Sequence, residues 1–75
     1  MPDTLVHVGE NLRRLRILNA LTQAQLAERA GVTTATVARA ERDEIEPHMT
    51  TVRKLSDALG VHPRELIERS DDAKH

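Results

Sequence analysis

The sequence predicts an all-α fold, a compact domain of five short helices. Apolar residues recur at the three- and four-residue spacing of amphipathic helices through most of the 75 residues. Gly31 and Gly60 each follow such a stretch and can end it, because glycine readily adopts the left-handed conformation of a helix C-cap. Only Gly31-Val32-Thr33 separates the second predicted helix from the third, a connection typical of a helix-turn-helix.

The composition is that of a small globular domain. With 39% hydrophobic and 31% charged residues the chain can form an apolar core, which must be aliphatic because aromatic residues are absent. The absence of cysteine removes disulfides and thiolate metal sites. No apolar run approaches the roughly 18 residues of a membrane helix. We therefore expect a cytoplasmic protein with no membrane partner.

The first predicted helix covers residues 5–19. Asp3 or Thr4 can cap its start, and Asn19 belongs to the turn that ends it. Gly9 lies inside this helix although glycine weakens helices. The apolar residues at helical spacing, which are expected to face the core, are Leu5, Val8, Leu12, Leu15 and Leu18.

The second predicted helix, residues 23–30, begins with a capping box. The Thr22 hydroxyl is expected to accept a bond from the Gln25 backbone N–H, and the Gln25 side chain to accept one from the Thr22 N–H. The third predicted helix, residues 34–42, begins after Thr33. The residues of these two helices expected to face inward are Leu26, Ala27, Ala30, Val37, Ala40 and Glu41.

Two further helices are predicted, at residues 49–59 and 63–69. Pro63 suits a first helical position, where its missing N–H costs nothing. The apolar residues at helical spacing in the fourth helix are Met49, Val52, Leu55, Ala58 and Leu59. Residues 1–70 are thus expected to form a single domain, followed by a frayed polar tail at residues 71–75.

The pair of helices at residues 23–30 and 34–42 gives the main indication of function. Its spacing also fits an ordinary helical hairpin in a small bundle. The residues, however, resemble the phage-repressor and Cro-like, or XRE-type, helix-turn-helix family. The resemblance extends from about residue 9 to residue 68. The segments that carry it are residues 11–16, 21–33, 37–42 and 55–61, together with Pro47.

The resemblance implies a five-helix, lambda-repressor-like DNA-binding domain. In this family the third helix enters the major groove of double-stranded DNA, commonly as part of a two-fold dimer. The expected protein is therefore a sequence-specific transcriptional regulator that binds an inverted-repeat operator as a homodimer, and not an enzyme. Ile45, Val61 and Ile67 are candidates for the dimer surface if they are exposed.

The resemblance places Thr34, Ala35 and Arg39 against the bases. Helix geometry agrees, because Ala35 and Arg39 are four residues apart and share one face. Arg39 can form a bidentate pair with guanine, and Thr34 and Ala35 suit thymine methyl groups. The alternative for Arg39 is a solvated surface arginine.

The resemblance also assigns Gln23, Thr36 and Arg42 to the DNA backbone. Gln23 starts a helix, where free N–H groups and the positive end of the dipole attract a phosphate. Its alternative role is that of a good first-turn residue. In similar domains, the residues that match Arg16 and Glu41 form a largely buried ion pair. By this resemblance, Arg16 and Glu41 are expected to fix the position of the third helix without touching DNA.

The acidic residues after the third helix depart from the family pattern and oppose DNA binding. Asp43 stands where the family usually has glycine, and Glu44 and Glu46 stand where it has basic residues. The formal net charge of −1 is also unusual for a nucleic-acid binder. An alternative with the same fold is a protein-interaction module, such as an antitoxin or anti-regulator, whose acidic loop meets a basic protein partner.

The remaining polar residues indicate no catalytic or metal site. The histidines, which show no i,i+4 pairing and no cysteine partners, are His7, His48, His62 and His75. His48 and His62 are expected at helix N-caps, and Arg13 and Arg14 are interpreted as solvated or distal phosphate-facing charges. No phosphate-binding glycine loop or Ser-His-Asp arrangement occurs, so no enzyme is expected, and no cofactor is expected either.

Overall fold

The computed structural model describes residues 8–68, and these residues form helices and connecting turns without a strand. The helices are α1 (Val8–Leu18), α2 (Gln23–Ala30), α3 (Thr34–Glu41), α4 (Met49–Leu59) and α5 (Arg64–Ile67). This architecture confirms the predicted all-α, five-helix fold. The expected cap residues Asp3 and Thr4, and the expected tail at residues 71–75, lie outside the described residues.

The bounds of α2 and α4 are those expected, whereas three helices are shorter. α1 ends at Leu18 instead of residue 19. α3 ends at Glu41, because Arg42 leaves the helical conformation as its C-cap. α5 is a single turn, since Pro63 is its N-cap and the backbone at Glu68 is extended. Among the residues expected at the DNA, only Arg42 is affected, because it follows α3 instead of being its last residue.

The turns between the helices form through local hydrogen bonds and two left-handed non-glycine residues. The capping box forms, with Gln25 N donating to Thr22 Oγ1 at 3.0 Å and Thr22 N to Gln25 Oε1 at 2.9 Å. Ala20 and Asp43, each with φ of 57°, reverse the chain after α1 and α3. Asp tolerates this conformation better than most residues.

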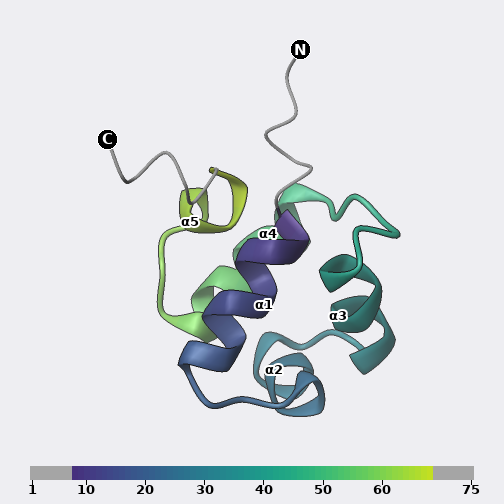
Figure 1. Cartoon of the computed structure of the whole chain (residues 1–75), viewed down its shortest axis with the longest axis vertical. Helices are drawn as coiled ribbons and strands as arrows, with labels where there is room; N and C mark the ends of the chain where they lie inside the picture. Colours follow the sequence, from purple (N-terminus) through teal and green to yellow (C-terminus); the bar gives the residue numbers. More distant parts are fainter. Residues whose placement is uncertain (1–7, 69–75) are drawn as a thin grey trace.

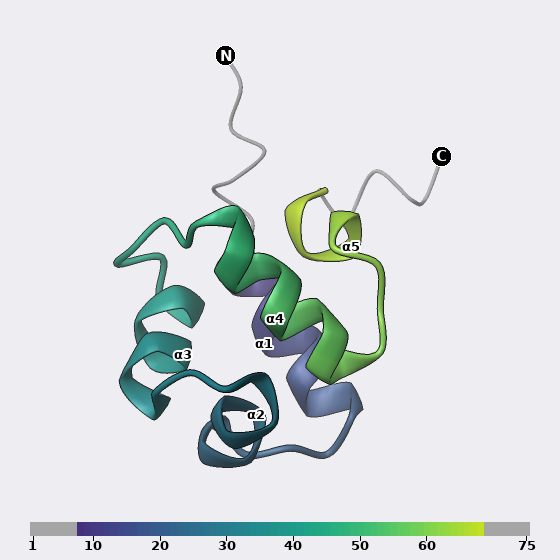
Figure 2. The ribbon, with the colours of Figure 1, turned by 180° about the vertical axis from the view of Figure 1, so that it is seen from behind.

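The core lies between α1 and α4, which occupy opposite faces of the molecule (Figures 1 and 2). α3 and α5 flank them on opposite sides in both views. The buried cluster is entirely aliphatic and consists of Leu12, Leu15, Leu21, Leu26, Ala27, Ala30, Val37, Ala40, Val52, Leu55, Leu59 and Leu66. Leu18 and Met49, expected to face the core, are instead 70% and 56% exposed; they are the last residue of α1 and the first residue of α4.

Gly9 explains how α1 and α3 come so close. A Cβ at this position would lie 2.6 Å from the Ala40 carbonyl oxygen and 2.7 Å from that of Glu41. The Gly9 N–H donates to Asp43 Oδ1 at 3.2 Å. A glycine that weakens α1 as a helix therefore permits the start of α1 to pack directly on the end of α3.

Asn11 attaches α5 to α1. Its side chain is 1% exposed. Its Nδ2 donates to the carbonyl oxygens of Leu66 at 2.8 Å and Glu68 at 2.5 Å. These bonds satisfy carbonyls at the end of α5 that have no partner within the helix. No helix within residues 8–68 has the length and apolar character needed to cross a membrane.

Candidate nucleic-acid interface

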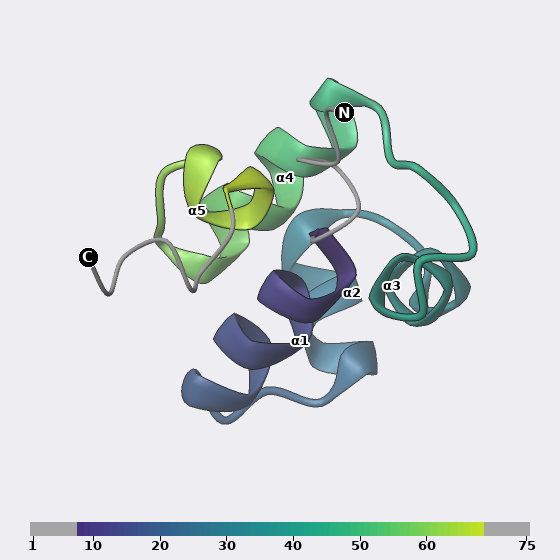
Figure 3. The same cartoon turned by 45° about the horizontal axis from the view of Figure 1, so that its top comes forward.

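α2 and α3 form a helix-turn-helix whose turn is set by Gly31. This residue has a φ of 74° and ends α2, and Val32 N then donates back to Ala27 O at 3.0 Å. Thr33 starts α3 by accepting the Thr36 N–H at 3.1 Å. Figure 3, which looks nearly along α3, shows this helix at the edge of the molecule.

α3 has one buried and one exposed face. Val37 and Ala40 are buried in the core. Thr34, Ala35 and Arg39, the residues expected at the bases, are all exposed. Within residues 8–68, Arg39 takes part in no ion pair. The exposed face of α3 therefore combines small side chains with a solvent-facing guanidinium.

Arg16 and Glu41 form an ion pair that ties α1 to the end of α3. Arg16 Nε lies 2.5 Å from Glu41 Oε2, and Arg16 Nη2 donates to Glu41 Oε1 at 3.0 Å. The two side chains are only 13% and 4% exposed. The hydrogen bonds to Glu41 raise the pKa of Arg16 above its ordinary value. Arg16 Nη1 also donates to Leu21 O at 2.8 Å, which fixes the turn between α1 and α2.

Gln23 belongs to the same network. Its Nε2 donates to Glu41 Oε1 at 3.0 Å, so the first residue of α2 is held against the last residue of α3. Sequence reasoning missed this contact, because the two residues are 18 positions apart and belong to different helices. The half-buried Gln23 amide retains its oxygen and a second N–H for another partner.

Thr36 and Arg42, which were expected at the DNA backbone, both have partners within the domain. Thr36 is half-buried, and its Oγ1 lies 2.9 Å from Thr33 Oγ1. Arg42 makes two bonds to Glu44, from Nε at 2.7 Å and from Nη2 at 3.1 Å. The pair is exposed, and exposed ion pairs exchange readily with other charged groups.

The groups around Glu44 lower the pKa of its carboxyl. Its hydrogen bonds to Arg42, and then the nearby charges of Arg42 and Arg39, hold the pKa of this carboxyl below its ordinary value. The same bonds raise the pKa of Arg42. Glu44 is therefore an anion paired with Arg42 and close enough to Arg39 to be influenced by its charge.

The acidic segment after α3 is partly engaged inside the domain. Asp43 accepts the Gly9 N–H, and Glu44 pairs with Arg42. Glu46 makes no ion pair within residues 8–68. These bonds reduce the negative charge available to a basic partner protein.

The histidines of the described part have local roles. No group of three or more His, Cys, Asp or Glu residues within residues 8–68 could hold a metal ion. His48 is the N-cap of α4, but its side chain makes no capping bond. His62 precedes the N-cap of α5, which is Pro63, and His62 Nδ1 accepts the Arg64 N–H at 3.2 Å. The expectation that His62 is itself an N-cap was therefore wrong by one residue.

Two short helices joined by a tight turn, the second with an exposed outer face, define the class of helix-turn-helix DNA-binding proteins. The helix-turn-helix family model matches residues 12–66. The chain therefore belongs to the helix-turn-helix family, in its phage-repressor and Cro-like form. This is a family of transcription regulators and not of enzymes.

Named relatives support this assignment. The immunity repressor protein of Bacillus phage phi105 is 33% identical over 60 residues, 80% of this chain, which spans 42% of that repressor. The uncharacterized HTH-type transcriptional regulator y4dJ of Sinorhizobium fredii is 35% identical over 65 residues, 87% of this chain and 84% of the regulator.

Solved structures share the fold. The restriction-modification controller protein C.AhdI from Aeromonas hydrophila superposes with a TM-score of 0.79 at 37% identity, covering 83% of this chain and 94% of that chain. The hypothetical transcription factor NHTF from Neisseria superposes with a TM-score of 0.87 at 25% identity, covering 95% of this chain and 81% of that one.

Proposed function

We propose that this chain is a sequence-specific transcriptional regulator that inserts α3 into the major groove of DNA. The observation that carries the proposal is the exposed face of α3, where Thr34, Ala35 and Arg39 face solvent while Val37 and Ala40 are buried. A guanidinium suits guanine O6 and N7, and the small side chains suit thymine methyl groups.

The phosphate contacts of the proposal surround this face. Gln23 stands at the N-terminus of α2, where free backbone N–H groups favour an anion, and Glu41 holds its amide in place. Thr36 and Arg42 are the other proposed backbone contacts. For Arg42 a phosphate takes the place of the Glu44 carboxylate, since both are oxyanions that a guanidinium binds in the same way.

We further propose that the chain acts as a homodimer on an inverted repeat. Two copies of α3 in successive major grooves lie about 34 Å apart on B-DNA. Of the candidates for the dimer surface, Ile45 is 38% exposed, whereas Val61 and Ile67 pack partly against the core. Ile45 is therefore the most available of the three.

A selection of bound duplexes from random DNA tests this proposal. The purified full chain is expected to enrich an inverted repeat whose half-sites are separated by one helical turn. Sedimentation of the complex with the enriched duplex is expected to show two chains per duplex. Enrichment of a single half-site with one chain bound would remove the dimer from the proposal, and no enrichment at low salt would remove sequence-specific binding altogether.

A further inference from the structure

The outward face of α1 carries two exposed aliphatic residues at consecutive positions. Ile17 is 55% exposed and Leu18 is 70% exposed. They are adjacent in sequence at the C-terminal end of a helix whose other face forms the core. These two residues form a small apolar surface that is available to another molecule.

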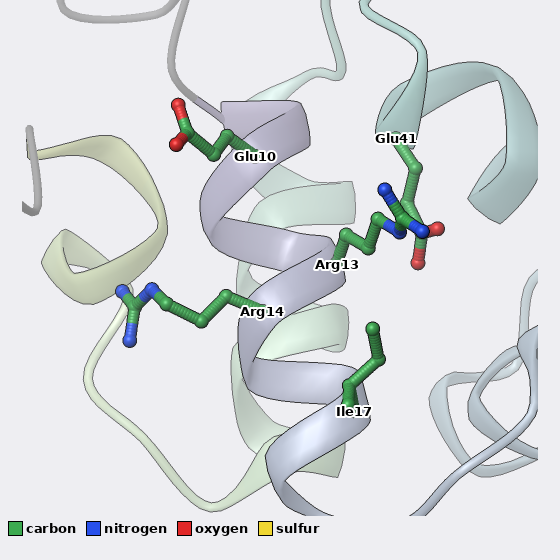
Figure 4. A pocket seen from close by; sticks show the side chains of 5 residues that line it. All are labelled: Glu10, Arg13, Arg14, Ile17 and Glu41. Carbon is green, nitrogen blue, oxygen red and sulfur yellow. The ribbon is translucent and has the colours of Figure 1, made fainter.

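Two arginines stand one helical turn earlier. Arg13 precedes Ile17 by four residues and Arg14 precedes Leu18 by four, a spacing that places each pair on one side of the helix. Figure 4 shows Arg13 and Arg14 leaving the outward face of α1 in different directions, Arg13 toward α3 and Arg14 toward α5, with Ile17 on the α3 side. Both arginines and Ile17 help to line a shallow hollow of about 380 Å³, together with Glu10 and Glu41.

The two arginines of this surface, Arg13 and Arg14, are not engaged in ion pairs within residues 8–68, although Glu10 lines the same hollow. Glu41, which lines the hollow, already accepts bonds from Arg16 and Gln23. The strip formed by Arg13, Arg14, Ile17 and Leu18, here called the α1 strip, thus presents two guanidinium groups beside two aliphatic side chains.

We propose that the α1 strip is a docking surface for an acidic segment of another protein. The segment would present Asp or Glu side chains one helical turn away from aliphatic side chains. Carboxylates would pair with the guanidinium groups, and the aliphatic side chains would cover Ile17 and Leu18. DNA phosphates would satisfy only the arginines and leave the aliphatic pair in water. The α1 strip is distinct from the exposed face of α3, so this inference does not rest on DNA binding.

The probe is a short synthetic helical peptide of Glu and Leu, with Leu at three- and four-residue spacing. We expect its addition to the isotope-labelled full chain to shift the NMR signals of the α1 strip more than those of α3. The double variant Arg13→Glu/Arg14→Glu should weaken peptide binding by about tenfold or more, because it places like charges opposite each other. The double variant Ile17→Gln/Leu18→Gln should weaken it by about fivefold or more.

The matched control is Arg53→Glu/Lys54→Glu, which makes the same charge change on the exposed surface of α4. It should leave peptide affinity within about twofold, since α4, which carries both residues, lies on the opposite face of the molecule from α1 (Figures 1 and 2). A peptide with Ser in place of Leu should bind at least about fivefold more weakly than the probe.

Four results would overturn the proposal. The first is an equal loss of affinity in the control variant, and the second is a set of shifts centred on Arg39 and Arg42. The third is the absence of binding by a chain that melts normally. The fourth is concentration-dependent burial of Ile17 and Leu18 in the chain alone, which would assign the α1 strip to a second copy of the chain.

Discussion

Gln23 Nε2 donates to Glu41 Oε1 at 3.0 Å, and the same carboxylate accepts hydrogen bonds from the guanidinium of Arg16. One buried acid thus joins α1, the start of α2 and the end of α3. A lateral shift of α3 would break bonds to both neighbouring helices. We infer that Glu41 sets the position of the exposed face of α3 without belonging to that face.

Replacing Glu41 should therefore destabilise the domain. Glu41→Ala leaves the largely buried Arg16 without its carboxylate, and such a change costs about 3–5 kcal/mol in the free energy of unfolding. Urea denaturation followed by circular dichroism measures this loss. Glu44→Ala, in which the lost ion pair is exposed, serves as the control and should have a small effect. Equal stability of the two variants would contradict the role assigned to Glu41.

Gly9→Ala should also destabilise the domain, although alanine favours helices by about 1 kcal/mol over glycine. The added Cβ would lie 2.6 Å from the Ala40 carbonyl oxygen, and neither backbone can move without loosening α1 from α3. Overpacking of this kind costs about 1–3 kcal/mol. Thermal melting tests the prediction, and a variant as stable as the original chain would show that α1 and α3 do not approach as closely as described.

Glu44→Gln should strengthen binding to DNA. The substitution removes a negative charge beside Arg39 and Arg42 and frees the Arg42 guanidinium for a phosphate. The dependence of log K on log salt should steepen by up to about one unit, as expected for one more phosphate contact. Glu28→Gln, on the exposed surface of α2, removes the same charge elsewhere and is the control. If the original chain, Glu44→Gln and Glu28→Gln had the same DNA affinity and the same salt dependence, Glu44 would not compete with phosphate.

The titration of Glu44 gives a prediction that needs no DNA. Because its pKa is lower in the folded chain than in the unfolded chain, its stabilising contribution is present above the ordinary carboxyl pKa. That contribution is lost as the pH falls through the lowered value. Arg42→Ala should raise the pKa of Glu44 toward its ordinary value, and Arg39→Ala should raise it by less. NMR titration of the side-chain carboxyl carbon measures both changes, and an unchanged Glu44 pKa in Arg42→Ala would rule out the pairing in solution.

Local signals allowed most of the fold to be predicted from the sequence. The capping box at Thr22 and the left-handed Gly31 depend on a few neighbouring residues, and these same residues fix the turn of the helix-turn-helix. Within residues 8–68, helical periodicity identified the core correctly except at two helix ends, whereas Leu5, also expected in the core, lies outside the described residues. Leu18 and Met49 continue the apolar pattern, but no element within residues 8–68 buries them.

The site was predictable only in part, because its contacts join distant segments. The exposure of Arg39 follows from helix geometry once α3 is placed. The hydrogen bond between Gln23 and Glu41 joins two helices, and no spacing in the sequence indicates it. The two bonds between Arg42 and Glu44 depend on how the chain leaves α3 through the left-handed Asp43.

The central claim is that the exposed face of α3 reads bases through Arg39. Binding constants of Arg39→Ala and of the control Arg53→Ala for the selected duplex and its single-base variants test this claim most directly. We predict that Arg39→Ala loses about 1–3 kcal/mol of discrimination at one guanine per half-site, whereas Arg53→Ala keeps the full preference. A uniform loss of affinity in Arg39→Ala, with the preference for every base unchanged, would contradict the claim.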